Sequence, residues 1–384
     1  MLTPTQQKAK AAMLFGEDLF LTGAAGSGKS YLINDFCEDS AKSIALLGTT
    51  GLGASVIGGR TVHSYFGLGI KEYSEQTLLN KIRDNTSIKE DVVIIDEVSM
   101  LPANLFTPIR QVLKERGKQL ICVGDFYQLP PVKGDFAFNS PEWDLGFYFL
   151  EGSQRSDDEL LNTALNKIRK GDYPEEFLKD CLKEPPSDKE IPVLFPHNKA
   201  VDNLNQERLA KLPGTAVQFM HEYETRTEPR IMADSPFCFK RDALVMITAN
   251  DPYGEYFNGS CGNVVDWTES SVKVRLLTGD KVWVKQVKRE YQMKADGSWK
   301  TFKNRYMPMK LAWALTIHKS QGQSYDMAVM DLRDLFAPGQ GYVALSRLRS
   351  KEGIYLKGFD KTSCLVSEEV KQWMKTKIKE VKNG

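Results

Sequence analysis

Eight residues near the amino terminus form a loop suited to binding phosphate. They match the pattern G-x-x-x-x-G-K-[ST] and read Gly23-Ala24-Ala25-Gly26-Ser27-Gly28-Lys29-Ser30. An apolar run precedes them and a helical pattern follows from Tyr31, which is the context that this motif requires. The glycines let backbone N–H groups close around phosphate, Lys29 can reach the β- and γ-phosphates, and Ser30 can hold Mg²⁺. We therefore predict a site for ATP and Mg²⁺, with a chance glycine-rich turn as the alternative.

Two acids and a glutamine could supply hydrolysis at this site. Asp96 and Glu97 end an apolar run, where Asp96 can complete the Mg²⁺ site with Ser30 and Glu97 can deprotonate a water. Gln128 also follows an apolar run and can hydrogen-bond the γ-phosphate or the water. A solvated turn or a helix cap is the alternative for the acids. A surface turn stiffened by Pro130-Pro131 is the alternative for Gln128.

These side chains need a scaffold that brings distant segments to one edge. Continuous apolar runs separated by helical patterns are typical of strands buried on both faces of a parallel sheet. The first series comprises Asp18–Leu21, Ser43–Leu47, Val92–Ile95 and Leu120–Val123. A second series comprises Phe147–Leu150, Val193–Phe195, Met327–Met330, Tyr342–Leu345 and Gly353–Leu356. The sequence therefore predicts an α/β protein with two such sheets.

Two further segments have a different pattern of apolar residues. Residues 237–306 alternate with period two and contain turn sequences at Thr278–Asp280 and Asp296-Gly297, which predicts a small antiparallel barrel inserted into the second series. The carboxyl-terminal stretch has helical spacing of its apolar residues, which indicates a docking helix or a partner-binding helix. These apolar residues are Val370, Trp373, Met374, Ile378 and Val381.

Length and composition limit the alternatives. A chain of 384 residues exceeds one compact core and predicts two or more domains. The net charge of +1 gives no indication of nucleic-acid binding, so any such surface must be a local patch. Six scattered cysteines argue against a disulfide framework or a zinc site, and no apolar run is long enough to span a membrane. The amino terminus leaves no room for a signal peptide, and we expect a cytoplasmic, monomeric protein of a bacterium or a phage-infected cell.

Taken together, the loop, Asp96–Met100 and Gly124–Val132 resemble superfamily 1 helicases of the PIF, RecD and Dda type. The short segment between Met100 and Gly124 lacks the longer PIF signature, so the subfamily stays open, although Gly124–Val132 is closer to PIF than to Dda. Leu2–Gln6 is similar to the family's Q motif, which implies an adenine contact for Gln6. Arg155 stands where the motif IV arginine lies. Leu311–Gly322 resembles motif V, with Gly322 at the nucleotide, and Tyr342–Arg347 resembles motif VI, with Arg347 as an arginine finger.

The resemblance also implies a domain plan and a direction of movement. Residues 1–152 would form the first RecA-like motor domain, with a short wedge insertion at about 67–90. Residues 153–236 and 307–384 would form the second motor domain, and 237–306 an SH3-like domain. Ile70 and Tyr73 are candidates for the residue that splits the duplex. The branch is expected to move 5′→3′ along DNA, hydrolysing ATP between its two motor domains, and a surface salt bridge is the alternative for Arg155 and Arg347.

Several residues are predicted to contact single-stranded DNA. Hydroxyl, imidazole and ammonium groups suit phosphate contacts, and an aromatic ring can stack on a base. The candidates are Thr50, Gly51, His63, Phe66, Thr316, His318, Lys319 and Ser320. The two histidines could instead be core residues. Residues 281–310 add nine Lys/Arg interleaved with aromatics, a pattern that suits single-strand binding but also follows from ordinary strand alternation.

The predicted function is therefore that of an ATP-dependent helicase with Mg²⁺ as cofactor. Its expected partners are single-stranded DNA and single-strand/duplex junctions. An RNA helicase or RNA-dependent ATPase is one alternative, because no residue type here reads a 2′-hydroxyl by itself. A P-loop protein that uses ATP only as a switch is another, although it would not need Glu97 beside Asp96.

Overall fold

The computed structural model describes residues 2–50, 53–54, 57–68, 73–151, 158–187, 190–220, 222–223, 237–249, 251, 253–256, 260–295 and 298–383. The chain forms two compact units. The first comprises Met1–Leu68, Tyr73–Pro196 and Thr316–Gly384, and the second comprises Gly69–Glu72 and His197–Leu315. The finer division into two motor domains and an insert stays a prediction.

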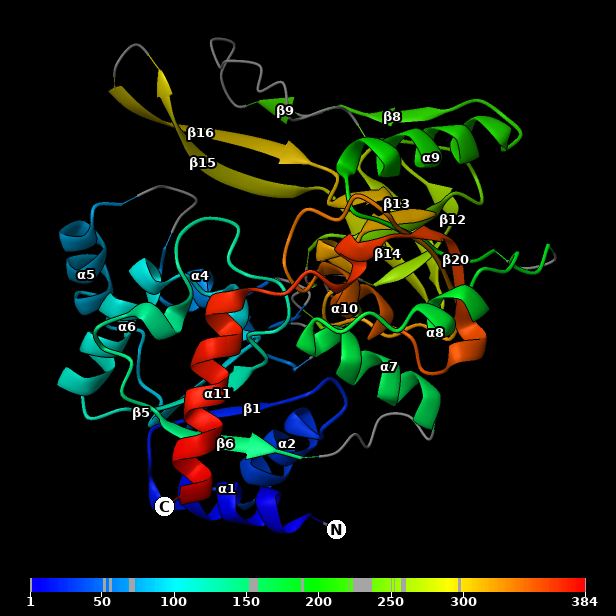
Figure 1. The fold of residues 1–384 in the computed structure, drawn as a ribbon. Helices are drawn as coiled ribbons and strands as arrows, with labels where there is room; N and C mark the ends of the chain where they lie inside the picture. Colours follow the sequence, from blue (N-terminus) through cyan, green and yellow to red (C-terminus); the bar gives the residue numbers. More distant parts are fainter. Residues whose placement is uncertain are drawn as a thin grey trace. The chain divides into compact units, whose positions relative to one another are not determined.

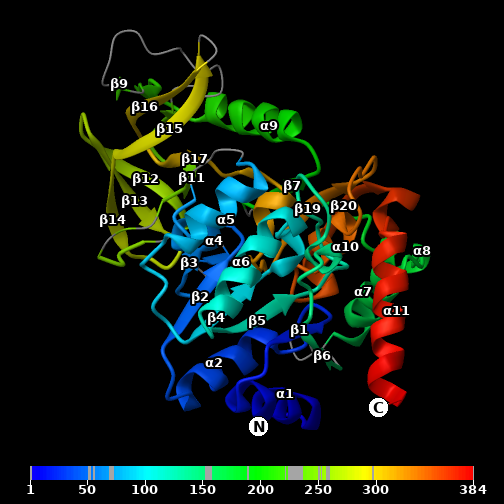
Figure 2. The same cartoon turned by 90° about the vertical axis from the view of Figure 1, so that its left-hand side faces the viewer.

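A six-stranded parallel sheet forms the first part of unit one. Its order is β3-β2-β4-β5-β1-β6, and Figure 2 shows these strands side by side. The strands are β1 (Leu19–Gly23), β2 (Ile44–Gly48), β3 (Arg60–Thr61), β4 (Val92–Asp96), β5 (Gln119–Gly124) and β6 (Gly146–Leu150). The four predicted strands of the first series are confirmed. Phe147–Leu150, expected to begin the second series, instead pairs with β1 at the edge of the first sheet, so that expectation is wrong.

Apolar side chains leave this sheet alternately toward two cores. Phe20, Val93 and Cys122 point into one core, and Leu21 and Ile94 into the other. The second core is covered by α1 (Pro4–Phe15) and α2 (Lys29–Asp39). The first is covered by α4 (Val62–Tyr65), α5 (Glu75–Arg83), the 3-10 helices η1 (Val98–Met100) and η2 (Ala137–Asn139), and α6 (Ala103–Glu115). Burial on both faces explains why the strands read as unbroken apolar runs.

A second sheet has the order β18-β7-β19-β20, and β7, β19 and β20 belong to unit one. Its strands are β7 (Val193–Phe195), β18 (Ala314–Thr316), β19 (Ala328–Leu332) and β20 (Ile354–Phe359), with β19 parallel to both β7 and β20. The associated helices are α7 (Glu159–Lys170), α8 (Glu175–Asp180), η3 (His318–Ser320), α10 (Gln340–Leu345), η4 (Lys351–Gly353) and η5 (Lys361–Cys364). Tyr342–Leu345 was expected as a strand and is wrong as such: it lies in α10, whose six residues are all buried.

The carboxyl-terminal helix α11 (Glu368–Asn383) docks on the first sheet beside β6 (Figure 1). Val370 and Met374 are fully buried in the first core. Trp373 stacks on Phe138 with a centroid separation of 4.5 Å and an interplanar angle of 14°, and it meets Phe126 edge-on. These contacts confirm the docking interpretation of the helical pattern.

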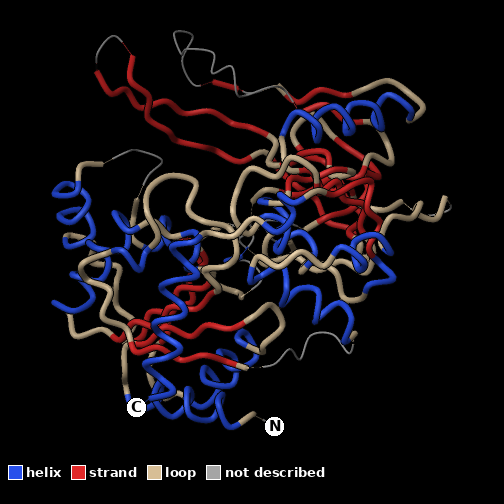
Figure 3. The backbone as a smooth tube through the Cα atoms, in the orientation of Figure 1, coloured by secondary structure: helices blue, strands red, loops and turns tan. Residues whose placement is uncertain are grey.

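Strands dominate unit two, as Figure 3 shows. A five-stranded antiparallel sheet has the order β14-β13-β12-β11-β17, a ribbon joins β15, β16 and β9, and β8 pairs with β10. The elements are α9 (Asn198–Lys211), β8 (Val217–Phe219), β9 (Glu222–Tyr223), β10 (Phe237–Phe239), β11 (Leu244–Ile247), β12 (Cys261–Trp267), β13 (Ser271–Leu276), β14 (Lys281–Lys285), β15 (Val287–Ala295), β16 (Ser298–Tyr306) and β17 (Met309–Leu311). The predicted antiparallel pairing within 237–306 is confirmed, including the turn after β13. The barrel and its bounds stay predictions, since β8, β9 and β17 outside this range also pair with its strands. Its SH3-like character stays a prediction, and Asp296-Gly297 lies outside the described residues.

The structure also bears on the cysteines and on membrane-spanning helices. Each of the six cysteines is free, in agreement with the absence of close pairs in the sequence. Over the described residues, no helix combines the length and the apolar character that crossing a membrane would require.

Candidate active site

The phosphate-binding loop connects β1 to α2 at the carboxyl end of the sheet. Gly26 and Gly28 both have φ of +82°, a left-handed conformation that glycine adopts without a steric cost. Gly23 is closely packed, since a Cβ there would lie 2.6 Å from Ser27 Oγ. The loop therefore needs small residues for close packing and glycines for its backbone turns. Its N–H groups and the start of α2 form a concave site for an anion.

Lys29 lies folded over this loop. Its Nζ donates to the carbonyl oxygens of Gly23 at 2.8 Å and of Ala24 at 3.0 Å. Burial lowers the pKa of Lys29, while the carboxylates of Asp125, Glu97 and Asp96 act in the opposite direction. A phosphate would offer this ammonium a stronger, charged acceptor than the two carbonyls.

A cavity of 390 Å³ opens beside the loop. It is lined by residues of the first sheet together with residues that follow the second sheet's strands β18 and β19. The lining residues are Ala25, Gly26, Gly28, Lys29, Ser30, Tyr31, Gly53, Asp96, Glu97, Gln128, Gly322 and Arg347. The structure thus brings together most of the residues that the sequence analysis assigned to ATP and Mg²⁺.

Asp96 and Glu97 stand where β4 ends. Asp96 Oδ1 accepts a hydrogen bond from the Glu97 amide at 2.8 Å. Burial and the neighbouring Glu97 raise the pKa of Asp96 to about 7, against the opposing effects of that amide and of Lys29. Glu97 has φ of +54°, an uncommon conformation for a residue other than glycine. Strained backbone of this kind is frequent where a side chain has to be aimed at a substrate.

The donor set fits a magnesium ion. The Asp96 carboxylate and the exposed Ser30 hydroxyl both line the cavity and offer hard oxygen ligands. Two protein ligands are enough, because Mg²⁺ in nucleotide sites takes its remaining ligands from phosphate and water. Among the described residues no cluster of three or more His, Cys, Asp or Glu could hold a metal without such help.

One residue that the sequence analysis left unassigned joins the two proposed catalytic side chains. Gln321 Nε2 lies 3.3 Å from Glu97 Oε2 and 3.4 Å from Gln128 Oε1. Within the described part of the chain, its own Oε1 is buried without a hydrogen-bond partner. Gln321 belongs to the segment that resembles motif V, so the resemblance marked its neighbourhood, but local sequence could not show which side chains it would meet.

Arg347 follows directly after α10 and reaches the same cavity. It is 3% exposed, and its guanidinium donates to the Val343 carbonyl at 3.0 Å and to Ser346 Oγ at 2.9 Å. Gly322 lines the cavity with φ of +83°. Arg155 lies outside the described residues, so its role stays a prediction.

Gln6 makes a contact that differs from the expected one. It is 1% exposed and does not line the cavity. Its Oε1 accepts from the Thr3 amide at 2.9 Å, and its Nε2 donates to the Ser27 carbonyl at 3.4 Å. Gln6 therefore caps α1 and supports the phosphate-binding loop, and its adenine contact stays a prediction.

The candidate DNA residues separate into two groups. Thr50, His63, His318 and Lys319 are exposed or half-buried, and the His318 ring stacks on Phe336 at 5.9 Å. The second group is buried, which corrects three expectations, for Phe66, Thr316 and Ser320.

Phe66 is fully buried edge-on against Tyr65 in the first core, so it does not present a face to a base.

The other two corrections concern the turn at η3. Ser320 is fully buried, and its hydroxyl donates to the Ile317 carbonyl at 2.8 Å. Thr316 is 5% exposed, and its hydroxyl oxygen is 3.3 Å from the Lys319 amide. These two side chains hold the turn that presents His318 and Lys319. Gly51 and Ile70 lie outside the described residues, whereas Tyr73 is half-buried before α5.

The basic segment 281–310 is described only in part. Lys281 and Lys285 are exposed on either side of buried Val282 and Val284, which is ordinary strand alternation. The side chains of residues 289–303, including most of the predicted aromatics, lie outside the described part, so single-strand binding by this segment stays a prediction.

The two α/β sheets and the loop-lined cavity define a P-loop nucleotide-binding protein. A family model described as PIF1-like helicase matches residues 2–137. The chain is 35% identical to an "ATP-dependent DNA helicase Pif1" of Bdellovibrio bacteriovorus over 97% of this chain and 92% of that protein. The chain therefore belongs to the PIF1-like helicase family, which settles the subfamily left open by the sequence.

Solved structures agree with this assignment. The crystal structure of Pif1 helicase from Candida albicans has a TM-score of 0.84 at 29% identity and covers 98% of both chains. Pif1 helicase from Bacteroides, in complex with ADP-AlF3 and single-stranded DNA, has a TM-score of 0.83 at 26% identity, covering 99% of this chain and 98% of that one. Several other curated relatives are longer, and the chain spans 59–67% of their length.

Proposed function

We propose that this chain is an ATP-dependent DNA helicase that moves 5′→3′ along single-stranded DNA and unwinds duplex ahead of it. The observation that carries the proposal is the cavity, which gathers Lys29, Asp96 and Glu97 from the first sheet with Gly322 and Arg347 from the second series. ATP bound there would contact both sheets. A change in the phosphates can then change how the two sheets approach each other, which is the basis of movement.

Each side chain has a role that its position supports. Lys29 would leave the loop carbonyls for the β- and γ-phosphates, and Ser30 with Asp96 would hold Mg²⁺, which neutralises phosphate charge when bound. Glu97 would take a proton from the attacking water. Gln128 and Gln321 would orient that water, because Gln321 Nε2 lies 3.3 Å from Glu97 Oε2 and 3.4 Å from Gln128 Oε1. Arg347 would stabilise the charge that develops on the transferred phosphoryl group.

DNA is the proposed track because the relative from Bdellovibrio bacteriovorus is named a DNA helicase and the Bacteroides helicase was solved with single-stranded DNA. In this chain the exposed side chains of His63 and Lys319 offer phosphate contacts. Direction and the position of the wedge rest on the family resemblance.

ATP hydrolysis with and without single-stranded DNA or RNA tests the proposal, with Lys29→Ala as the control. Stimulation by DNA that disappears in Lys29→Ala, followed by unwinding of 5′-tailed but not 3′-tailed duplex, is the expected result. Removing this lysine should lower kcat by about 10³-fold or more, because one charge that contacts the transferred phosphoryl group is lost. Greater stimulation by RNA would transfer the assignment to RNA, and hydrolysis that neither nucleic acid affects would refute a motor.

A further inference from the structure

A buried charged cluster joins α7 and α10 to the loop after β5. The two oxygens of Asp125 accept hydrogen bonds from Arg169 Nε and Nη2, both at 2.9 Å. Asp125 is fully buried and Arg169 is 7% exposed, with its guanidinium 4.4 Å from the centre of the Tyr127 ring. A bidentate pair of this kind fixes the orientation of the carboxylate as well as its charge.

Tyr342 extends this cluster to the phosphate-binding loop. Its hydroxyl accepts a hydrogen bond from the Ala25 amide at 2.7 Å and donates to Asp125 Oδ2 at 3.2 Å. Burial raises the pKa of Tyr342, and the Asp125 carboxylate raises it further, so the hydroxyl keeps the proton that it donates. One oxygen atom thus connects the loop after β1 with the loop after β5. Both loops line the cavity, through Ala25 and Gln128 respectively.

The helix that carries Tyr342 also leads to the proposed arginine finger. Tyr342 lies in α10, and Arg347 comes five residues after Tyr342, just beyond the end of that helix. The start of α10 is pressed against the loop after β5, where a Cβ on Gly339 would lie 2.4 Å from the Tyr127 carbonyl oxygen and 2.6 Å from that of Gln128. Gly339 also has φ of +76°, so both space and backbone require glycine there. A shift of α10 would therefore displace Arg347, Gln128 and the phosphate-binding loop together.

We propose that Tyr342 is a positioning residue for ATP hydrolysis, whose hydroxyl keeps the phosphate-binding loop and the Asp125 loop in register with α10 and hence with Arg347. Tyr342 is not among the residues that line the cavity. Its effect is on the alignment of Lys29, Gln128 and Arg347 around the transferred phosphoryl group. This inference rests on the proposed function, because it assumes that these three side chains serve hydrolysis.

Tyr342→Phe tests the inference, since it removes only the hydroxyl and keeps the buried ring. It leaves the Ala25 amide and one Asp125 oxygen with fewer partners, so the loops should lose alignment. We expect DNA-stimulated kcat to fall about 5- to 20-fold while KM for ATP changes less than about threefold, because alignment matters most in the transition state. Tyr148→Phe is the control: its hydroxyl donates to Glu17 at 2.8 Å, away from the cavity-lining residues, and kcat should stay within about twofold.

Measuring Tyr342→Phe in a second variant, Arg347→Lys, distinguishes a loss of alignment from a general loss of structure. In Arg347→Lys the finger is already misplaced, so adding Tyr342→Phe should cost less than about threefold in kcat. A full Tyr342→Phe effect in that background, or a Tyr342→Phe enzyme with kcat within twofold of the parent, would overturn the inference. Failure of the proposed function looks different, because the parent protein itself would then lack DNA-stimulated hydrolysis.

Discussion

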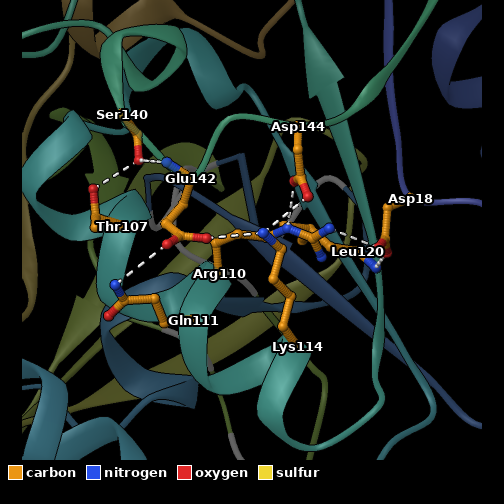
Figure 4. Close-up of polar contacts among 9 residues, drawn as sticks. All are labelled: Asp18, Thr107, Arg110, Gln111, Lys114, Leu120, Ser140, Glu142 and Asp144. Atoms are coloured by element: carbon orange, nitrogen blue, oxygen red, sulfur yellow. Dashed lines mark hydrogen bonds and ion pairs between the residues drawn. The ribbon is translucent and has the colours of Figure 1, made fainter.

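At the carboxyl ends of β1 and β4 the charged side chains of the first sheet line a cavity, whereas at the amino ends of β1 and β5 a comparable set is bonded internally. Arg110 is 3% exposed and forms ion pairs with Asp18 at 2.7 Å and with Asp144 at 2.9 Å, while Lys114 bonds Glu142 and Asp144 (Figure 4). Asp18 also accepts from the Leu120 amide at 2.6 Å, which fixes the start of β5.

The cavity end is bonded less completely. Among the described residues, Lys29 Nζ donates to two carbonyl oxygens and to no carboxylate, and Ser27 Oγ and Gln321 Oε1 are buried without a partner. Arg110 Nη1 at the opposite end is also buried without a partner in this part of the chain, but Arg110 Nε and Nη2 are both bonded to carboxylates. Leaving such groups unpaired costs free energy that a ligand can later recover. In this sheet, charged side chains at one end stabilise the fold, whereas those at the other end remain available to a ligand. Substitutions at the two ends should therefore affect different measurements.

The largest expected effect is at the cavity end. Glu97→Gln should lower DNA-stimulated kcat by about 10²- to 10⁴-fold, because the amide cannot accept a proton from water. Stability should be kept or slightly raised, since a carboxylate next to Asp96 is removed. Steady-state ATP hydrolysis measures kcat and thermal unfolding measures stability, while binding of a fluorescent ADP analogue checks that the nucleotide site is intact. A variant with parental kcat would remove Glu97 from the mechanism.

The opposite end should give the reverse pattern. Arg110→Met should lower the free energy of unfolding by about 2 kcal/mol, less than for a fully buried pair because Asp18 and Asp144 are partly exposed. Well below the melting temperature kcat should stay within about twofold. Urea unfolding gives the stability. Arg83→Met is the control, since it breaks the exposed pair with Glu115 and should change stability less. Equal effects of the two variants would show that burial of Arg110 contributes nothing.

The smallest effect should be one of pH. Burial raises the pKa of Asp144, but the hydrogen bonds and charges of Arg110 and Lys114 together outweigh that effect, so the net pKa lies below the ordinary value. The contribution of the Asp144 carboxylate to the free energy of unfolding is therefore fully present above about pH 4, the ordinary pKa of aspartate. It is lost as the pH falls through the lowered pKa. We expect less than about 1 kcal/mol after solvent screening. Urea unfolding from pH 5 to 3 should show a shallower decline in Asp144→Asn than in the parent, and parallel curves would contradict the assignment.

Sequence predicted the parts of the site whose function depends on local spacing. The phosphate-binding loop needs its glycines and Lys29 in fixed positions, so the eight residues alone indicate its conformation. Asp96 and Glu97 could be placed because parallel strands end at one edge. The exposure of single side chains was less predictable. Phe66 and Ser320 have types that suit DNA contact, but the core around them decides that they are buried.

Contacts between residues far apart in the chain could not be predicted from local sequence, for a different reason. Tyr342 and Asp125 are 217 residues apart, and nothing near either residue indicates that they meet. The run Tyr342–Leu345 is wholly apolar or aromatic and fully buried, and such a run does not distinguish a strand from a short helix. Local sequence does not predict the role of Gln321 either, because its two contacts come from separate loops.

The docking of α11 has a consequence for how the polypeptide folds during synthesis. Val370, Trp373 and Met374 complete a core whose other aromatics include Phe20, Phe126 and Phe138. A nascent chain in which residues up to about 150 have left the ribosome therefore has the first sheet's sequence but an open aromatic face. That face stays open until more than 200 further residues have been translated. Chaperones that hold unfolded chains bind exposed apolar surface of this kind. We therefore expect the yield of folded protein during synthesis to depend on such chaperones.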